Sequence, residues 1–523
     1  VVYVYANLVK QNTKVNEMKL FNCKIILPLA FLLIVGCSKS TDVDFPITSS
    51  SEAAKELYKK AWYYWDQGDG LKGWELMEEA LSLDPDFILA NLYVPTTDPN
   101  KWKEYKDRAK ENSKNGNDYE KLAVKMWVAG RESRSMDYIN LCKELVSKYP
   151  SSSQSYVMLG DAYTGVKDFD NAIANYEKAL DINSSQYLAW AGLVKHQVTV
   201  GGNTMLPKNK QSKKLALKYA DGLVKTRPEA PFSYQIKGNI ERQYSDMEAA
   251  RVQYEKMIEV AEKTKSTSLG AGYNLVAHTY LFTGDYQKSR ENYEMAASRS
   301  PSKYSKISYG EFGVWSYLYE NDYDGAVKAL DELDQKVDDQ NFSESEVLNY
   351  KANNQFTKFI AHSYNQNKSG AYDALQANWR FREERLSLDE SEDLVSRRNY
   401  DTFNAWMESW YYILFAEYDK AQKSLGRLYA LVKDLQSPGS LDGYNSLSGM
   451  VSLFSGDPKK AVSYFENIEK ENNVYFAYFK ALALEGVGEN EKAQEIFTFL
   501  ANWNFQGWKP ALVRGLAKDK VNG

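Results

Sequence analysis

The sequence predicts an all-α fold built from repeated helix pairs, and three observations support this prediction. Prolines number only 13 in 523 residues, which is typical of a mostly helical chain. Within residues 156–184, apolar and small residues recur at spacings of three and four, which places them on one face of a helix. The two sets are Tyr156, Leu159, Gly160 and Tyr163, and then Ala172, Tyr176 and Ala179. A short turn, residues 167–169, separates the sets and completes a helix-turn-helix unit.

The turn of this unit recurs along the chain, at a spacing near 34 residues where the repeats are regular. It has a small or polar residue, then an acidic residue, then often an aromatic one. It reads GDG at 68, KDF at 167, SDM at 245, GDY at 284, NDY at 321, AEY at 416, GDP at 456 and GEN at 488. The pattern closely resembles the tetratricopeptide repeat. This resemblance implies a right-handed superhelical solenoid of about eleven helix-turn-helix pairs.

The repeat array is expected to span residues 52–506. Its pairs are predicted to start near residues 54, 119, 153, 187, 231, 270, 307, 354, 402, 442 and 474. One further, irregular pair is expected at residues 88–117, and the pair that starts at 187 carries an insertion, GGNTMLPKNKQ. Residues 507–523 are predicted to form a C-terminal capping helix, because an array must cover its last apolar face.

The N-terminal segment has the pattern of a secretory signal that ends at a cysteine. Lys19 and Lys24 accompany an apolar run of 11 residues, 25–35. This run is too short to cross a bilayer, because a spanning helix needs about 20 apolar residues. A cleaved signal peptide fits better. Its end, IVGC, resembles the lipobox of bacterial lipoproteins, and the resemblance implies cleavage before Cys37, lipidation of its thiol and acylation of the new amino terminus.

Three segments of the N-terminal region follow from this interpretation. Residues 1–17 are expected to be a mis-called upstream leader with Met18 as the true start, because a leader before a signal is unusual. Residues 18–36 form the lipoprotein signal peptide, and residues 37–51 form the lipidated cysteine and a flexible tether. More than one acyl chain gives stable anchoring, so the protein would be held on a membrane. The alternatives are an ordinary secretory signal and an uncleaved anchor.

Charge and motifs argue against several functions. With 65 basic and 70 acidic residues, the net charge of -5 provides no field that would recruit nucleic acid. None of the three histidines lies in an HExxH motif, and the three cysteines form no CxxC pair. The chain also lacks GxSxG, GxGxxG and Walker A motifs. We therefore expect no enzyme, no metal site and no cofactor.

A candidate partner-binding groove follows from the resemblance to tetratricopeptide repeats. In that family the first helix of each pair lines the concave face, and the ninth repeat position points into it. That position and its neighbours give Trp62, Trp127, Lys195, Asn239, His278, Trp315, His362, Trp406, Trp410, Tyr475 and Tyr478. Two interpretations remain open. Other parts of the chain cover the aromatic side chains, or a ligand does, since large exposed aromatic groups are rare without a contact.

Three function classes remain open. Residues 44–87 also resemble the start of tetratricopeptide repeat lipoproteins of the Bacteroidota type, most without an assigned activity. The expected function is therefore a membrane-anchored scaffold that binds an envelope protein or peptide, held on the bacterial outer membrane on either its periplasmic or its outer side. The alternative is a surface lipoprotein that binds glycans, because Trp and Tyr rings stack on sugars. An enzyme would require clustered acids in a closed pocket.

Overall fold

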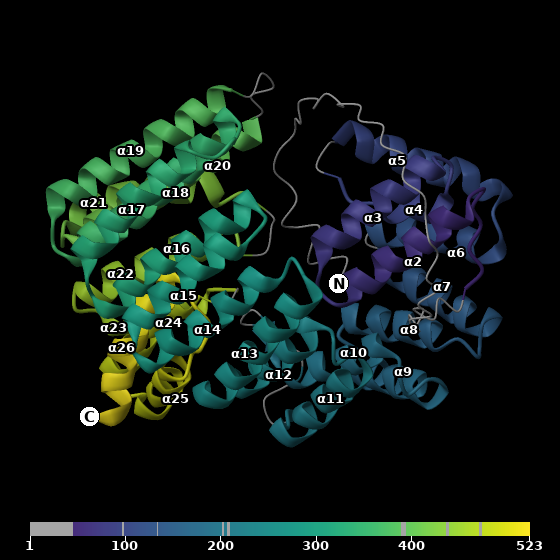
Figure 1. Cartoon of the computed structure of the whole chain (residues 1–523). Coiled ribbons are helices and arrows are strands. Elements are labelled where there is room, and N and C mark those ends of the chain that lie inside the picture. The colour runs from purple at the N-terminus through teal and green to yellow at the C-terminus, as the bar shows by residue number, and fades with distance from the viewer. Residues whose placement is uncertain are drawn as a thin grey trace. The chain divides into compact units, whose positions relative to one another are not determined.

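The structure is a computed structural model that describes residues 45–96, 99–132, 134–200, 203–204, 206, 210–388, 394–435, 439–469 and 473–523. The predicted leader, signal peptide and lipidated Cys37 lie outside these residues. Helices account for nearly all the elements of the described part, as the sequence predicts (Figure 1). Two short strands, β1 (Thr199–Val200) and β2 (Asn203–Thr204), pair at the predicted insertion.

Successive helices form pairs that follow the chain in order (Figure 1). The pairs are α2 (Glu52–Asp66) and α3 (Gly70–Leu83), α4 (Ile88–Tyr93) and α5 (Pro99–Asn112), α6 (Asp118–Arg131) and α7 (Ser135–Lys148), α8 (Ser153–Gly165) and α9 (Phe169–Ile182), α10 (Tyr187–Gln197) and α11 (Lys213–Thr226), α12 (Pro231–Gln243) and α13 (Met247–Thr264), α14 (Leu269–Thr283) and α15 (Tyr286–Arg299), α16 (Lys303–Glu320) and α17 (Tyr323–Asp338), α18 (Glu344–Tyr364) and α19 (Lys368–Ser387), α20 (Leu394–Leu414) and α21 (Tyr418–Val432), α22 (Asp442–Phe454) and α23 (Pro458–Glu466), and α24 (Val474–Gly486) and α25 (Asn490–Ala501). A 3-10 turn, η1 (Ser113–Asn115), follows α5, and α26 (Trp508–Asn522) ends the chain.

The predicted all-α repeat fold is confirmed by this helix order. Nine pairs start within a few residues of the predicted positions, and α4 with α5 forms the irregular pair. Two pairs differ, because α18 and α20 begin at residues 344 and 394 rather than 354 and 402. The sequence predicts one continuous array, and the structure divides it into two compact units. The boundary falls within α12, between Ile236 and Lys237.

The recurring turn has a simple chemical basis. One residue of the turn adopts a left-handed backbone conformation, with φ between 55° and 85°, in nine turns: at Gly68, Lys167, Ser245, Gly284, Asn321, Gln366, Ala416, Gly456 and Gly488. The residue that follows is Asn367 in one turn and an acid in the others, and its side chain caps the second helix in every turn except those at Glu417 and Glu489. Asp168, for example, accepts a hydrogen bond from the backbone N–H of Asn171 at 3.3 Å, and Asp322 accepts one from Gly325 at 2.9 Å. These side chains satisfy backbone donors that the first turn of a helix leaves free.

Large side chains lie over small residues between the two helices of a pair. Tyr176 on α9 is fully buried, and it lies over glycines of α8 and α10. A Cβ atom on Gly160 would approach Tyr176 Cε1 to 2.8 Å, and one on Gly192 would approach Tyr176 Cζ to 2.5 Å. A Cβ atom on Gly238 of α12 would likewise approach Tyr254 Cε1 of α13 to 2.3 Å. One tyrosine ring therefore joins its own pair to the next one.

The predicted flexible tether is shorter than the sequence indicates, because residues 45–51 are docked. Phe45 is 5% exposed and stacks on Tyr119 of α6 with ring centroids 4.2 Å apart. Both the backbone N–H and the hydroxyl of Thr48 donate to the buried carboxylate of Glu120. Ser51 accepts from the N–H of Ala54 and caps α2. The prediction of a free tether up to residue 51 is therefore wrong for these seven residues.

A second contact between distant segments of the first unit joins α2 to residues 227–229. Arg227 lies 3.5 Å from Asp66 at the end of α2, and both side chains are 14% exposed. The Arg227 guanidinium also lies over the rings of Tyr63 and Tyr187, with 5.0 and 4.6 Å to the ring centroids. The hydroxyl of Tyr63 donates to Glu229 at 2.8 Å. The first helix of this unit therefore contacts the turn between α11 and α12.

Ala179→Arg tests the packing within the pairs. Ala179 is fully buried on α9, so a guanidinium there would lose its hydration without gaining a counter-ion. We expect the free energy of unfolding to fall by about 3 kcal/mol or more. Thermal melting followed by circular dichroism measures the change, and Lys178→Arg on the exposed side of α9 is the control. Equal melting of the two variants would contradict the helix register.

Asp66→Asn tests the contact between α2 and residues 227–229. Burial raises the pKa of Asp66 to about 6, and the attraction of Arg227 opposes this shift. Because the pKa in the folded state exceeds the unfolded value of about 3.9, the stability that Asp66 contributes is full below about pH 4 and is lost as the pH rises through 6. We therefore expect the wild-type protein to gain stability between about pH 7 and pH 5, and the variant to gain less. Identical pH profiles in thermal melting would count against this assignment.

Candidate functional site

The predicted groove residues divide into two sets by burial. Four of them are buried: Trp410 and Tyr475 at 0% exposure, His278 at 3% and Tyr478 at 8%. The other seven are partly buried: Trp62, Trp127, Lys195, Asn239, Trp315, His362 and Trp406. The prediction that the residues of the first set line an open groove is corrected by their burial. They belong to the interior of the second unit.

Trp410 lies at the centre of an aromatic cluster that the C-terminal helix completes. Its ring centroid lies 5.2 to 5.6 Å from those of Phe359, Trp406, Tyr475 and Trp508. The indole N–H of Trp410 donates to the hydroxyl oxygen of Tyr475 at 3.1 Å, and the hydroxyl of Tyr364 donates to the same oxygen at 2.8 Å. The cluster therefore has paired polar groups, as a stable buried site requires.

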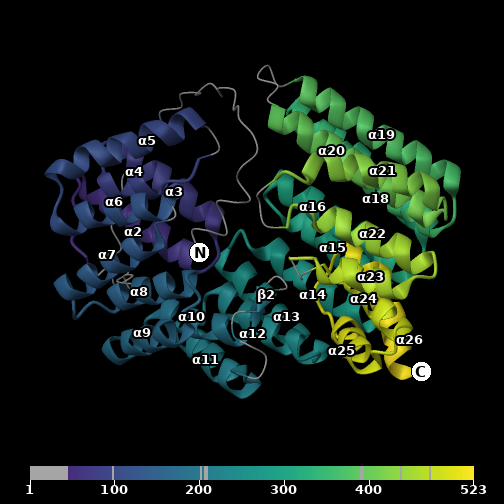
Figure 2. The ribbon, with the colours of Figure 1, turned by 180° about the vertical axis from the view of Figure 1, so that it is seen from behind.

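The C-terminal helix α26 has more contacts than an end cap would make. It packs against α24 and α25, which lie beside it in Figure 2, and also against α16, far back in the sequence. Its Trp508 ring contacts Phe356 and Tyr475 as well as Trp410. The helix α26 therefore does more than cover the end of the array, because it also covers aromatic residues of α18, α20 and α24.

The segment before α26 holds the start of the second unit. Asn504 donates through Nδ2 to the carbonyl oxygen of Arg242 at 3.1 Å and to the hydroxyl of Ser245 at 3.0 Å. Arg514 donates to Asn504 Oδ1 at 3.1 Å and to the carbonyl oxygen of Trp503 at 2.8 Å. Residues separated by about 260 positions are thus joined by direct hydrogen bonds, which no local sequence pattern indicates.

Aromatic side chains of the first unit are covered by the irregular pair. The Trp62 ring lies 5.3 Å from that of Tyr93, and the Trp127 ring lies 5.8 Å from that of Trp102 on α5. Lys106 fixes α5 on α4, because its ammonium donates to the carbonyl oxygens of Asn91 and Val94 at 2.8 and 3.1 Å. Burial and the nearby positive charge of Arg131 lower the Lys106 pKa to about 7. These contacts favour the internal interpretation of the tryptophans.

Two buried histidines, His196 and His278, have partners inside the protein. His278 Nδ1 accepts from Arg242 at 2.8 Å, because a guanidinium can only donate. Burial, together with the Arg242 charge, keeps the His278 pKa well below its usual value. His196 Nε2 lies 3.2 Å from the Thr164 hydroxyl, a distance that a nucleophile and its base would have. However, His196 is fully buried and packs on Tyr176, so no substrate reaches it.

Charged side chains of the first unit remain accessible at the ninth position of neighbouring repeats. Asp161 on α8 is exposed, and Lys195 on α10 is partly buried. The hydroxyl of Tyr176 donates to Asp161 Oδ1 at 2.7 Å, which orients the carboxylate. Asp161 is the ninth residue of the pair that starts at 153, but it is not among the predicted groove residues, because the sequence pattern gave no reason to select it over the aromatic residues.

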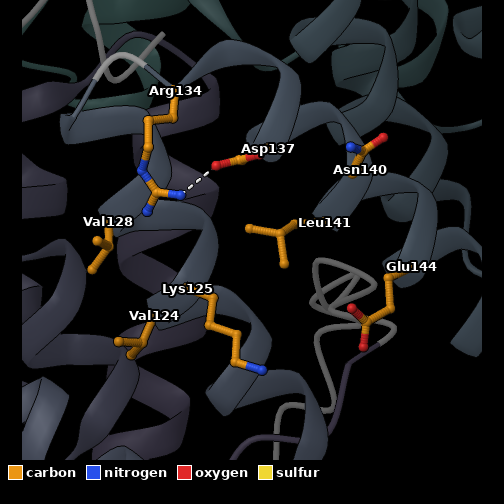
Figure 3. A pocket seen from close by; sticks show the side chains of 8 residues that line it. All are labelled: Val124, Lys125, Val128, Arg134, Asp137, Asn140, Leu141 and Glu144. Atoms are coloured by element: carbon orange, nitrogen blue, oxygen red, sulfur yellow. Dashed lines mark hydrogen bonds and ion pairs between the residues drawn. The ribbon is translucent and has the colours of Figure 1, made fainter.

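A shallow hollow lies between α6 and α7, away from the predicted groove (Figure 3). Its volume is about 460 Å³, and Val124, Val128 and Leu141 form its apolar part. The charged and polar side chains around it are Lys125, Arg134, Asp137, Asn140 and Glu144, and Arg134 forms an ion pair with Asp137. The sequence gave no signal for this hollow, because it depends on how α6 and α7 pack against each other.

The described residues contain no group of three or more His, Cys, Asp and Glu side chains placed to hold a metal ion. Nor does any described helix combine the length and the apolar character needed to cross a bilayer.

Trp410→Ala distinguishes a core residue from a groove residue. Removing a fully buried indole leaves a cavity and deprives Tyr475 of a hydrogen bond. We expect the free energy of unfolding to fall by about 3–5 kcal/mol. Chemical denaturation measures this loss, and Trp102→Ala, a partly buried residue of α5, is the control for which a smaller loss is expected. A stable Trp410→Ala protein would show that the aromatic cluster is not part of the core.

Several solved structures are similar to this chain at low sequence identity. Among solved structures, the chain is similar to a Pseudomonas aeruginosa pilF structure, with 14% identity and a TM-score of 0.31, over 44% of this chain and 90% of that one. A tetratricopeptide repeat protein from Parabacteroides merdae is 15% identical with a TM-score of 0.31, over 50% of this chain and 98% of that one. The Cut9–Hcn1 hetero-tetramer of APC/C is 14% identical with a TM-score of 0.33, over 85% of this chain and 76% of that one. No curated protein matches the chain.

Two segments of the chain, residues 153–186 and 271–303, match the sequence profile of the tetratricopeptide repeat. They coincide with the pair α8 and α9 and the pair α14 and α15. These two segments are tetratricopeptide repeats, and the turn and the helix packing that they show recur in other pairs of the chain.

Proposed function

We propose that this protein is a lipid-anchored scaffold of the bacterial cell envelope that binds a protein partner. Tetratricopeptide repeats are stacked helix pairs whose inner surface is available for extended or helical segments of another protein. The observation that carries the proposal is the pair of accessible charges, Asp161 and Lys195, at the same inner position of neighbouring repeats. Opposite charges at this position favour a partner segment that carries both signs.

The lipid anchor is the second part of the proposal. It rests on the sequence IVGC that ends at Cys37 and on the apolar run before it. The docked segment that starts at Phe45 supports it, because a chain that enters the array at a fixed point suits an anchor before that point. We place the protein on the outer membrane, with the lipid on Cys37 as its attachment.

The two other function classes have less support. Glycan binding requires a row of exposed rings, whereas Trp410 is buried, Trp62 packs edge-on against Tyr93 and Trp127 packs at a tilt against Trp102. An enzyme requires a reactive group that a substrate can reach, and the hydroxyl–imidazole pair of Thr164 and His196 is closed off by the burial of His196. A scaffold accounts for the observed surface without either feature.

Crosslinking in native membranes, followed by mass spectrometry, tests partner binding. We expect one dominant protein partner in the wild type, and its loss in Lys195→Glu, which reverses a charge of the inner position. Lys178→Glu makes the same charge change on the exposed side of α9 and is expected to keep the partner. Loss of the partner in both variants, or in neither, would overturn the proposed binding surface.

Cys37→Ser tests the anchor separately. We expect the wild-type protein to incorporate a fatty-acid analogue and to sediment with membranes, and the variant to do neither, because the lipid is attached to the Cys37 thiol. Circular dichroism of the variant checks that the array is folded. Membrane sedimentation of the variant without label would show that another contact holds the protein, and the anchor proposal would fall.

A further inference from the structure

The docking of residues 45–51 fixes where the chain leaves the array. Phe45 is 5% exposed, with its ring stacked on Tyr119 and edge-on to Tyr149 at 5.4 Å. Asn117 donates through Nδ2 to the carbonyl oxygen of Pro46 at 3.0 Å. The chain therefore enters the array at the N-terminal end of α6, beside the C-terminal end of α7.

A buried carboxylate is the centre of this docking site. Glu120 is 0% exposed, and its Oε1 accepts from the Thr48 N–H at 2.8 Å. Its Oε2 accepts from the Thr48 hydroxyl at 2.6 Å and from the Asn117 N–H at 2.9 Å. A buried carboxylate is costly unless its oxygens are paired, so the segment and α6 hold each other in place.

The number of residues between Cys37 and Phe45 limits how far Phe45 can lie from a lipid on Cys37. Cys37 and Phe45 are separated by eight peptide units. A fully extended chain gains at most about 3.3–3.6 Å per residue, so eight units span no more than about 28 Å. A lipid on Cys37 therefore keeps the N-terminal end of α6 within about 28 Å of the membrane, about the length of a 19-residue helix.

Three lysines lie close to this entry point, beside the exposed Asp118, whose carboxylate is paired with Lys148. Lys114, Lys121 and Lys125 lie on η1 and α6, and all three side chains are exposed. None of the three forms an ion pair with a carboxylate of the part of the chain that the structure describes. Lys125 also borders the hollow between α6 and α7 (Figure 3). Cations close to a bilayer are attracted to anionic headgroups, and the attraction falls off within a Debye length.

We propose that the N-terminal end of α6, with Lys114, Lys121 and Lys125, is a surface that faces the membrane and contacts anionic lipid headgroups. Because residues 45–51 are docked on α6, the position of the anchor also limits the position of the helices. A free tether would not impose this limit. This inference rests on the proposed lipidation of Cys37, since the anchor brings the surface close to the bilayer. It adds an orientation of the first unit, in which α6 lies nearer to the lipid than α11.

Position-specific fluorescence quenching tests this orientation in the full, lipidated chain. Asn115→Cys on η1 and Lys218→Cys on α11 each place one label at an exposed position of the first unit. Cys142 is fully buried and stays unlabelled in the folded protein. The protein is bound to vesicles of phosphatidylcholine and phosphatidylglycerol that carry a quencher on the lipid headgroup. We expect loss of fluorescence at position 115 and little loss at position 218.

Two changes identify the cause of the difference. Phe45→Ala removes the stacking on Tyr119, so we expect the labels at 115 and 218 to become equally quenched, whereas Phe45→Tyr keeps the ring and the difference. Lys121→Glu with Lys125→Glu is expected to reduce quenching at 115, whereas Lys214→Glu with Lys225→Glu on α11 is the charge-matched control. Equal quenching with and without phosphatidylglycerol would overturn the headgroup contact.

The failure of the anchor and the failure of the orientation give different results. If the wild-type chain does not float with the vesicles, the proposed lipidation fails, and the orientation falls with it. If the chain floats but the labels at 115 and 218 are quenched equally, the anchor stands and the orientation is overturned.

Discussion

The close contact between a small residue on one helix and a large side chain on its neighbour is the constraint on which this structure depends. Tyr176 lies over both Gly160 and Gly192, so one ring joins two successive repeats. Any side chain at these glycines would meet the ring at less than 3 Å. Because each pair buries much of its apolar face against its neighbours, such contacts between successive pairs contribute much of the stability of the array.

An array of this kind leaves an apolar face at each end, and this chain covers its surfaces by contacts between distant segments. In the second unit, α26 covers Trp410 and Tyr475, and Asn504 is hydrogen-bonded to the end of α12. In the first unit, Arg227 contacts Asp66, and the segment at Phe45 covers Tyr119. The additional segments at the ends are thus part of the core and are not accessory tails.

The helix pairs could be predicted from the sequence because their determinants are local. A left-handed residue, an aspartate cap and a small residue at a fixed offset all lie within one repeat, as at Lys167, Asp168 and Ala172. The repeat position of Trp410 was predicted in the same way, but its burial was not. Its cover comes from Trp508, about 100 residues later, and no periodicity links the two. The same reason applies to Phe45, whose partner Tyr119 belongs to another pair.

The ninth repeat position shows why the fold and the function of such a chain can be separated. Stacking uses other positions, such as Gly160 and Tyr176, so the ninth position is free to vary without loss of the array. In this chain it holds Trp410 where α26 provides a cover, and it holds Asp161 and Lys195 where the side chains stay accessible. A charged residue at a covered position would lose its hydration, and an aromatic one at an accessible position would leave apolar surface in water. The residue type at this position therefore indicates which part of the inner surface the protein fills itself and which part it leaves for a partner.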